Sequence, residues 1–494
     1  MTELLLPTEI SIRHIISKKS LSPSNFATID IINHSRNKIS YFLNKDYPFE
    51  QGVEPGSFAY VKKSQISFIR NSCIDSFNFS NIEPKEIFLN PKYEFENSIT
   101  SNDVLMCKDA NIGDACLFIT EKNHNYLFSS GVVKLNFSSN LLKYYVFAFL
   151  RDRYFLSQLD LLTPKGSTLR HAGDRFLDCI IPAITRKEEN LLSVFEALIK
   201  NIAYAERYSF KNLERSNKII EEEIFINDLE SKDSHISDLK TSMRIDAGYF
   251  SDLVKTIEYN IRNYKFGSLT LESFGFSLKR GPNLQKRDLG RSIKSEFYKP
   301  NYHLLVYPSD ISDYGYILRE EYIGARNPVW YLKRGDILFS AEGTVGKVFV
   351  ICDEDMKFIT NIHGILISPL DVSPDLYKSI FLGQYLHYLR SKGYFGKISV
   401  GGQGGSFAVN YWKDFFIPNI SQEVMKKSAP LYYNYNQQPL IPFQFDETAL
   451  LSAGVFELNN FRILCTEILK RIVNDIKSDM TQDLNYYKEY FQKN

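Results

Sequence analysis

The sequence predicts an α+β fold in which one mixed domain occurs twice, accompanied by two long helices. Three observations predict it. A stretch that alternates apolar runs with glycine turns recurs at a fixed interval, similar elements follow each copy, and two segments free of glycine and proline carry apolar residues at helical spacing. The 494 residues are enough for two such domains with helical connectors.

The repeated stretch has the pattern of a β-hairpin. Residues 334–364 contain two apolar runs, Ile337–Phe339 and Val348–Ile351, on either side of a glycine-bearing turn. Residues 102–131 show the same pattern earlier in the chain. The paired landmarks, all separated by one constant interval, are Asp103 with Asp336, Gly113 with Gly346, Gly131 with Gly364 and Tyr144 with Tyr377. Ordered landmarks at one interval indicate a duplicated domain.

Similar elements follow each copy. The first is a helical segment, predicted over Leu141–Leu150 and over Leu376–Leu389. A glycine-containing loop comes next, at residues 164–167 and 401–406, and then a short strand that ends in Ile-Pro at Pro182 and Pro418. The copies are far apart in the chain, so the pattern indicates duplication of a whole domain and not a solenoid of short repeats.

Composition limits the class of protein. The chain is 44% hydrophobic and 24% charged, which suits ordinary folded cores, and its net charge of +1 leaves any attraction to nucleic acid to local patches. The six cysteines lack C-x-x-C spacing, so we expect small buried side chains and neither disulfides nor zinc ligands. No apolar run approaches the length of a membrane span, and the N-terminus lacks a signal pattern. We therefore expect a cytoplasmic protein with no membrane partner.

Two long amphipathic segments are predicted to be helices. Residues Arg186–Ile226 lack glycine and proline and carry apolar residues at three–four spacing, which predicts a helix of about 40 residues. Residues Val455–Asn494 show the same features. A narrow apolar stripe on a helix of this length calls for a partner helix. The predicted order is a domain at 1–185, a long helix at 186–240, a second domain at 241–420, and a connector with a C-terminal long helix at 421–494.

The most basic segment of the chain lies in the second domain. Residues Leu278–Tyr302 carry seven Lys and Arg against two acidic residues, and their glycines and proline predict a loop. Such a loop suits DNA, because lysines neutralise phosphates and arginines reach guanine edges, although a merely solvated loop is the alternative. The candidate DNA-binding residues are Lys279, Arg280, Lys286, Arg287, Arg291, Lys294, Lys299, Gly402, Gln403, Ser406, Lys62, Lys63, Lys165 and Arg170.

Motifs for catalysis do not emerge from the sequence. There is no G-x-x-x-x-G-K-[ST] and no H-E-x-x-H, and the eight histidines lack ligand spacing, so we assign no catalytic or metal-binding residue. The loop Gly401–Ser406 resembles a phosphate cradle, but no lysine follows it, which favours a turn or a DNA-facing loop over a nucleotide site.

These features together resemble the specificity subunits of type I restriction-modification systems. The resemblance rests on RGDILFSAEGTVGKV at 334–348, RIDAGYF at 244–250 and YPSDISDYGYI at 307–317, and it is weaker in the first half, where NDVLMCKDANIGD replaces the hairpin motif. It implies two target-recognition domains, each reading one half of a split double-stranded DNA sequence, separated by a long antiparallel helix pair.

The resemblance also implies partners. They are two adenine-N6 methyltransferase subunits and restriction or translocase subunits, which would carry S-adenosylmethionine and ATP, while this chain would hold no cofactor and serve bacterial phage defence. The absence of an N/D-P-P-Y/F motif agrees with a non-catalytic chain. The alternatives are a specificity module of another phage-defence modification complex, a divergent nuclease or methyltransferase, and a scaffold that does not bind nucleic acid.

Overall fold

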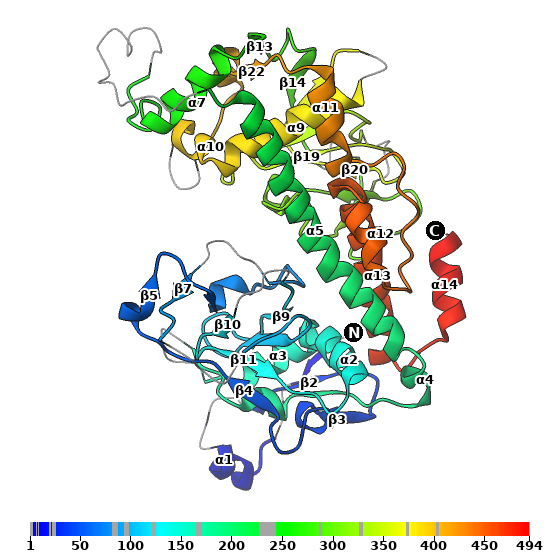
Figure 1. Ribbon diagram of the computed structural model, residues 1–494. Helices are drawn as coiled ribbons and strands as arrows, with labels where there is room; N and C mark the ends of the chain where they lie inside the picture. Colours follow the sequence, from blue (N-terminus) through cyan, green and yellow to red (C-terminus); the bar gives the residue numbers. More distant parts are fainter. Residues whose placement is uncertain are drawn as a thin grey trace. The chain divides into compact units, whose positions relative to one another are not determined.

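The computed structural model describes residues 3–5, 7, 9–18, 21, 26–81, 87–92, 98–120, 125–164, 170–226, 244–285, 289–325, 330–371, 375–401 and 405–493. The chain forms two compact units (Figure 1). Unit 1 comprises Met1–Arg207, Ile441–Asp446 and Leu464–Asn494, and unit 2 comprises Tyr208–Leu440 and Glu447–Ile463. Each unit is therefore assembled from separate segments of the chain.

Unit 2 is built on two four-stranded sheets. The first has the order β14-β21-β18-β19 and is antiparallel throughout. The second has the order β15-β17-β16-β20, in which β16 and β20 are parallel. The strands are β14 (Phe276–Arg280), β15 (Ser292–Ser295), β16 (His303–Leu305), β17 (Tyr322–Ala325), β18 (Ile337–Ser340), β19 (Val348–Val350), β20 (Phe358–Ile359) and β21 (Gly364–Pro369).

Unit 1 repeats this topology. One sheet has the order β4-β11-β8-β9 and is antiparallel, and the other has the order β10-β6-β7-β5, in which β6 and β10 are parallel. The strands are β4 (Phe49–Gln51), β5 (Tyr60–Val61), β6 (Ile66–Ile69), β7 (Phe88–Leu89), β8 (Val104–Cys107), β9 (Ala115–Leu117), β10 (Asn125–Phe128) and β11 (Val132–Leu135).

The interval between the sequence landmarks holds in the strands themselves. The start of β8 at Val104 and that of β18 at Ile337 are separated by the same interval as Asp103 and Asp336, and so are the starts of β9 and β19. The strands that end in Ile-Pro, β12 (Ile180–Pro182) and β22 (Phe416–Pro418), pair antiparallel with β3 (Arg36–Lys38) and β13 (Ser268–Thr270). The remaining pair, β1 (Glu3–Leu5) with β2 (Thr28–Asp30), belongs to unit 1. The predicted duplicated α+β fold is confirmed.

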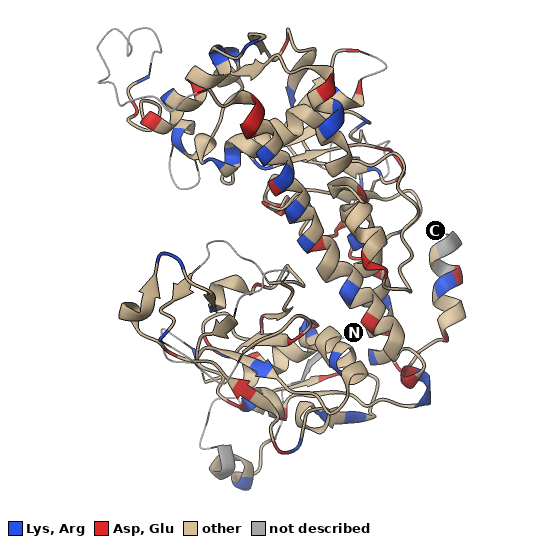
Figure 2. Cartoon of the chain, in the orientation of Figure 1, with Lys and Arg blue, Asp and Glu red and all other residues tan. Residues whose placement is uncertain are grey.

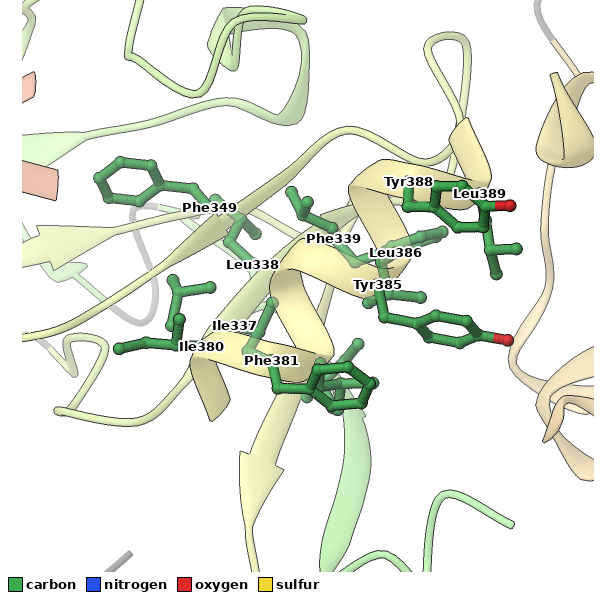
Figure 3. Close-up of a cluster of buried hydrophobic side chains, with 14 of the residues drawn as sticks. Ile337, Leu338, Phe339, Phe349, Ile380, Phe381, Tyr385, Leu386, Tyr388 and Leu389 are labelled. Atoms are coloured by element: carbon green, nitrogen blue, oxygen red, sulfur yellow. The ribbon is translucent and has the colours of Figure 1, made fainter. Parts of the chain in front are cut away.

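Helices complete both units. In unit 1 they are α1 (Ile12–Lys18), α2 (Asn140–Leu150), α3 (Arg153–Leu162), α4 (Arg186–Glu189) and α14 (Leu484–Lys493). In unit 2 they are α7 (Asp252–Arg262), α9 (Leu376–Ser391), α10 (Tyr394–Ile398), α11 (Gln422–Ser428) and α12 (Glu447–Ser452). Helices α2 and α9 are the predicted segments after each hairpin. The side chains of α9 pack on β18 and β19, as Figure 3 shows for Phe381 and Leu386 beside Ile337 and Phe339. This contact forms the core of unit 2.

Two long helices, α5 (Leu192–Ile224) and α13 (Val455–Lys477), contribute residues to both units (Figure 1). In unit 1, Glu188 just before α5 accepts a 2.6 Å hydrogen bond from Thr481, which follows α13. In unit 2, the amide of Asn212 on α5 donates to the carbonyl of Ala453, which precedes α13, at 2.9 Å. The beginning of α5 therefore lies by the end of α13, and the helices are antiparallel.

Both long helices are shorter than the sequence predicts. The first predicted helix, Arg186–Ile226, is divided into α4 and α5. Thr185 and Glu188 form a capping box at the start of α4, and the buried Glu188 side chain also binds Thr481. The second, Val455–Asn494, ends at Lys477, where Asp479 takes a left-handed conformation with φ of 55°. A residue other than glycine fills the position that usually ends a helix, so the absence of glycine was misleading.

The basic segment Leu278–Tyr302 is not a single loop as predicted. Lys279 and Arg280 lie on β14, and Lys294 lies on β15. Both are edge strands of their sheets, and their outward side chains are exposed. Charged residues are common on edge strands because they oppose pairing with another chain. The glycines and proline between the two strands led to the prediction of a single loop.

Candidate nucleic-acid interface

The hairpin turn has the same geometry in both units. Gly346 and Gly113 have φ of 92° and 90°, and each donates its backbone N–H to the last residue of the preceding strand at 2.9 Å. The turn also contains Gly343 in unit 2 and Ala110 in unit 1, with φ of 72° and 60°. Similar φ angles at positions related by the duplication mean that the two turns present their side chains from equivalent backbone.

A β-bridge connects this turn to a later segment of the chain in each unit. In unit 2, Ser406 forms β-bridges with Glu342 and Val400, and the N–H of Gly343 donates to the carbonyl of Gly405 at 3.1 Å. In unit 1, His171 forms the equivalent bridge with Asp109. Of the loop residues predicted from sequence, Ser406 and Arg170 thus lie beside the hairpin turn, whereas Gly402, Gln403 and Lys165 lie outside the described residues.

Glu342 is the centre of a polar cluster in unit 2. Its Oε2 lies 2.8 Å from His363 Nδ1 and its Oε1 lies 3.4 Å from Arg280 Nη1. The hydrogen bond with His363, followed by that with Arg280, holds the pKa of Glu342 below its usual value. The cluster joins β14, the hairpin turn and the residues before β21. It combines a fixed carboxylate with two donors on an exposed surface.

Asp109 occupies the equivalent position in unit 1. Its Oδ1 lies 2.8 Å from His171 Nδ1, and its backbone carbonyl accepts a 2.6 Å hydrogen bond from the Asn71 side chain. The imidazole comes from a different loop than in unit 2, yet it reaches the same carboxylate position. Arg170, the neighbour of His171, pairs with Asp160 at 2.7 Å.

The other basic candidates of unit 2 have distinct surroundings. Lys294 Nζ lies 2.7 Å from Glu321 and 3.1 Å from the Tyr307 hydroxyl, and the bond with Glu321 raises the pKa of Lys294. Lys279 lies over the Trp330 ring at 4.9 Å and Lys299 over the Tyr302 ring at 5.5 Å. Arg291 is exposed, and Lys286 and Arg287 lie outside the described residues.

These contacts reduce the local charge that the sequence suggests. Arg280 and Lys294 pair with Glu342 and Glu321, two carboxylates from outside the segment. Figure 2 shows the same mixture of basic and acidic residues over other elements, including α5. Lys279 and Lys299 are exposed and lie on aromatic rings, which leaves their ammonium groups able to meet phosphate.

Unit 1 supplies a counterpart to one part of this surface. Lys62 and Lys63 are exposed on the connection from β5 to β6. The equivalent connection in unit 2, from β15 to β16, contains Lys299. The sequences of these connections differ too much for alignment, so only the strand topology relates them.

Sequence reasoning missed the two carboxylate–imidazole pairs. Glu342 and Asp109 are separated by the interval of the repeat, so the sequence does mark them as equivalent positions. The candidates were chosen among basic and loop residues, which left both carboxylates out. His363 directly precedes the landmark Gly364, and His171 directly follows Arg170. That both imidazoles reach the carboxylates depends on tertiary structure.

The cysteines, possible metal ligands and helix hydropathy bear on the class of protein. All six cysteines are free and buried, as predicted, and burial raises the pKa of Cys116 and Cys352 well above the usual value. Across the part of the chain that the structure describes, no three His, Cys, Asp or Glu residues gather in a way that could hold a metal ion. No helix within the described ranges has the length and apolar character needed to cross a membrane.

No protein-family model and no curated protein matches the sequence. Among solved structures, the type I restriction-modification S subunit from M. genitalium is similar with 12% identity over 92% of this chain and 97% of that chain, at a TM-score of 0.42. The HsdS subunit from Thermoanaerobacter tengcongensis is similar with 14% identity over 93% and 95%, at a TM-score of 0.25.

A third similar chain comes from a structure described as the basis of complex assembly and conformational transition of the type I R-M system. It has 15% identity over 90% of this chain and 97% of that chain, at a TM-score of 0.28.

Proposed function

We propose that this chain is a DNA sequence-specificity subunit that reads a two-part target and directs a methyltransferase and restriction complex to it. The observation that carries the proposal is the pair of domains with the same sheet topology and the same hairpin turn, but with different side chains around that turn. Equivalent surfaces dock on DNA in equivalent ways, whereas different side chains at base edges select different base pairs.

The charge of the candidate surfaces supports DNA as the ligand. Exposed lysines lie on equivalent connections of both domains, at Lys62, Lys63 and Lys299. Lysines of this kind contact phosphate and position the protein, while the turn residues face the bases. The net charge of +1 means that binding depends on these local groups.

The chemistry is assigned to partners. We place adenine-N6 methylation on two methyltransferase subunits that bring S-adenosylmethionine, and cleavage on translocase subunits that use ATP. The support is the resemblance of residues 334–348 and 244–250 to type I specificity subunits. In this proposal the antiparallel helices α5 and α13 offer the methyltransferase subunits their docking surface.

The test is reconstitution. The full chain is purified alone and together with methyltransferase subunits encoded next to it, and methylated adenines are mapped on a DNA library. We expect methylation of a two-part site only when both proteins are present. Methylation or cleavage by this chain alone would identify it as an enzyme instead. A two-part site bearing another modification would point to a different defence complex, and failure to bind any DNA would reduce the chain to a scaffold.

A further inference from the structure

We propose that Glu342 and Asp109 are base-reading residues, each accepting a hydrogen bond from the N4 amino group of a cytosine in the major groove of its own half-site. This inference rests on the proposed function and adds to it a chemical identity for one base contact in each half. It follows from the position of the two carboxylates and their fixed orientation, and for Glu342 also from the positive charge beside it.

Position is the first argument. Glu342 and Asp109 are related by the interval of the duplication and lie on hairpin turns of matching backbone geometry. Each forms a β-bridge with a later segment of its unit, Glu342 with Ser406 and Asp109 with His171. Their side chains are 38% and 25% exposed, so part of each is accessible to a ligand. Both domains thus carry a carboxylate at the equivalent position of the turn, whereas the basic candidates do not recur at equivalent positions.

Orientation is the second argument. His363 and Arg280 each bond a different oxygen of Glu342, and His171 bonds Oδ1 of Asp109. A carboxylate has about four lone-pair sites, so these contacts orient it while leaving acceptor capacity. The shared element is the carboxylate–imidazole pair. Arg280 is an addition of the second domain. It pairs with Ile365, and the residue that bonds the equivalent Val132 in unit 1 is Gly52.

Charge is the third argument. A bare carboxylate is repelled by DNA phosphates, so a carboxylate on a DNA-binding surface needs neighbours that offset its charge. Arg280 supplies a permanent positive charge beside Glu342, and His363 adds a donor. The ion pair of Arg280 and Glu342 is too exposed to contribute much to folding, because solvent screens it. A role in selecting a base explains why Arg280 and His363 surround Glu342, whereas a contribution to folding stability does not.

Base chemistry selects the ligand. In the major groove, guanine presents two acceptors and thymine an acceptor and a methyl group, so both disfavour a carboxylate. Adenine presents an amino donor next to the N7 acceptor, which suits the amide of Asn or Gln. Cytosine presents an amino donor alone, which suits Asp or Glu. The side chains of Glu342 and Asp109 differ by one methylene, which fits two different half-sites.

The experiment uses the reconstituted complex with its methyltransferase subunits and a duplex library randomised over both half-sites. The variants are Glu342→Gln and Asp109→Asn, with Glu354→Gln as matched control. Glu354 also pairs with an exposed cation, Lys333 at 3.3 Å, but it lies at the other end of the β18–β19 hairpin. Melting temperatures of the variants close to that of the wild type establish that they are folded.

We expect Glu342→Gln to reduce the preference for cytosine at one position by roughly 5- to 150-fold, to admit adenine there, and to leave the other half-site unchanged. Asp109→Asn should do the same in the other half-site, and Glu354→Gln should change neither. Half-site preferences that stay the same in both folded variants would overturn the inference while the proposed function stands. A wild-type complex that selects no two-part site would instead overturn the proposed function.

Discussion

Arg462 of α13 and Glu320 form a buried ion pair, with Nη1 and Oε1 2.9 Å apart and exposed fractions of 2% and 5%. The same Nη1 donates to the carbonyl of Ile317 at 2.9 Å, and the guanidinium lies over the Tyr316 ring at 5.1 Å. One turn earlier, Asn459 accepts the N–H of Ile317 at 2.8 Å. Polar side chains of α13 thus fix the segment 316–320 within unit 2.

Removing one partner of this pair should destabilise the protein strongly. We expect Arg462→Ala to lower the free energy of unfolding by about 3–5 kcal/mol, because Glu320 is left buried without that partner. Replacing both residues by apolar side chains, as in Arg462→Met with Glu320→Leu, should restore much of the loss. Denaturant unfolding of both single variants and the double variant measures the coupling. A single variant as stable as the wild type would contradict the argument.

The hairpin turn provides a matched pair of glycines. A Cβ at Gly346 would lie 2.4 Å from Cδ2 of Phe395, whereas nothing lies within 4 Å of one at Gly343. Both have positive φ, which costs an alanine roughly 1–2 kcal/mol. We expect Gly343→Ala to cost about that much, and Gly346→Ala about 1–3 kcal/mol more from overpacking. Thermal unfolding compares the stabilities of the two variants. Equal losses of stability would show that the Phe395 side chain can move aside at little cost.

Glu457 should make stability depend on pH. Burial raises its pKa to about 7, although the N–H of Asn434 donates to Oε1 at 2.7 Å. Between the unfolded value near 4.5 and about 7, only the folded state binds this proton. Stability from this group is therefore present at low pH and is lost as the pH rises through 7.

The variant Glu457→Gln isolates this effect. Near pH 5 its stability should approach that of the wild type, and at pH 8.5 it should exceed the wild type by on the order of 2 kcal/mol, because the amide does not ionise. Other titrating groups cancel in the difference between the two proteins. Denaturant unfolding from pH 5 to 8.5 measures it. A difference that does not change with pH would mean that the folded carboxyl titrates near its ordinary value.

The duplication could be predicted because it lies in local signals. Asp103 and Asp336 show why: each accepts the N–H of the residue three positions earlier at 2.8 Å, at Thr100 and at Lys333. An aspartate, an apolar run and a glycine at fixed spacing encode this turn and hairpin in the sequence itself. The strands, the helix that follows and the strand ending in Ile-Pro were therefore all recovered.

The remainder depends on contacts between distant residues. The hydrogen bond from Thr481 to Glu188 joins residues that are far apart in the chain, and no local signal reports it. The partners of Arg280 and Lys294 are carboxylates from other strands and turns, so the segment 278–302 looked more basic than its surroundings are. The carboxylate–imidazole pairs were missed for the same reason.

The last prediction concerns the exposed cations of unit 2. Lys279, Arg291 and Lys299 are exposed, and two of them lie on aromatic rings. Lys294 is also exposed but is held by Glu321, so much of its charge is already compensated. If the surface meets DNA, each lysine or arginine that contacts a phosphate releases counterions, and the logarithm of the binding constant falls with the logarithm of salt concentration by about 0.9 per contact.

We therefore compare alanine variants by the salt dependence of DNA binding, measured between about 50 and 200 mM salt with the reconstituted complex. Replacing Lys279, Arg291 and Lys299 together should lower the slope by up to about 2.7, and replacing Lys294 alone should lower it by less than about 0.9 because its charge is shared with Glu321. Affinity should fall at all sequences alike for the lysines, since phosphate contacts carry no base information. A triple variant with the slope of the wild type would place these side chains away from DNA.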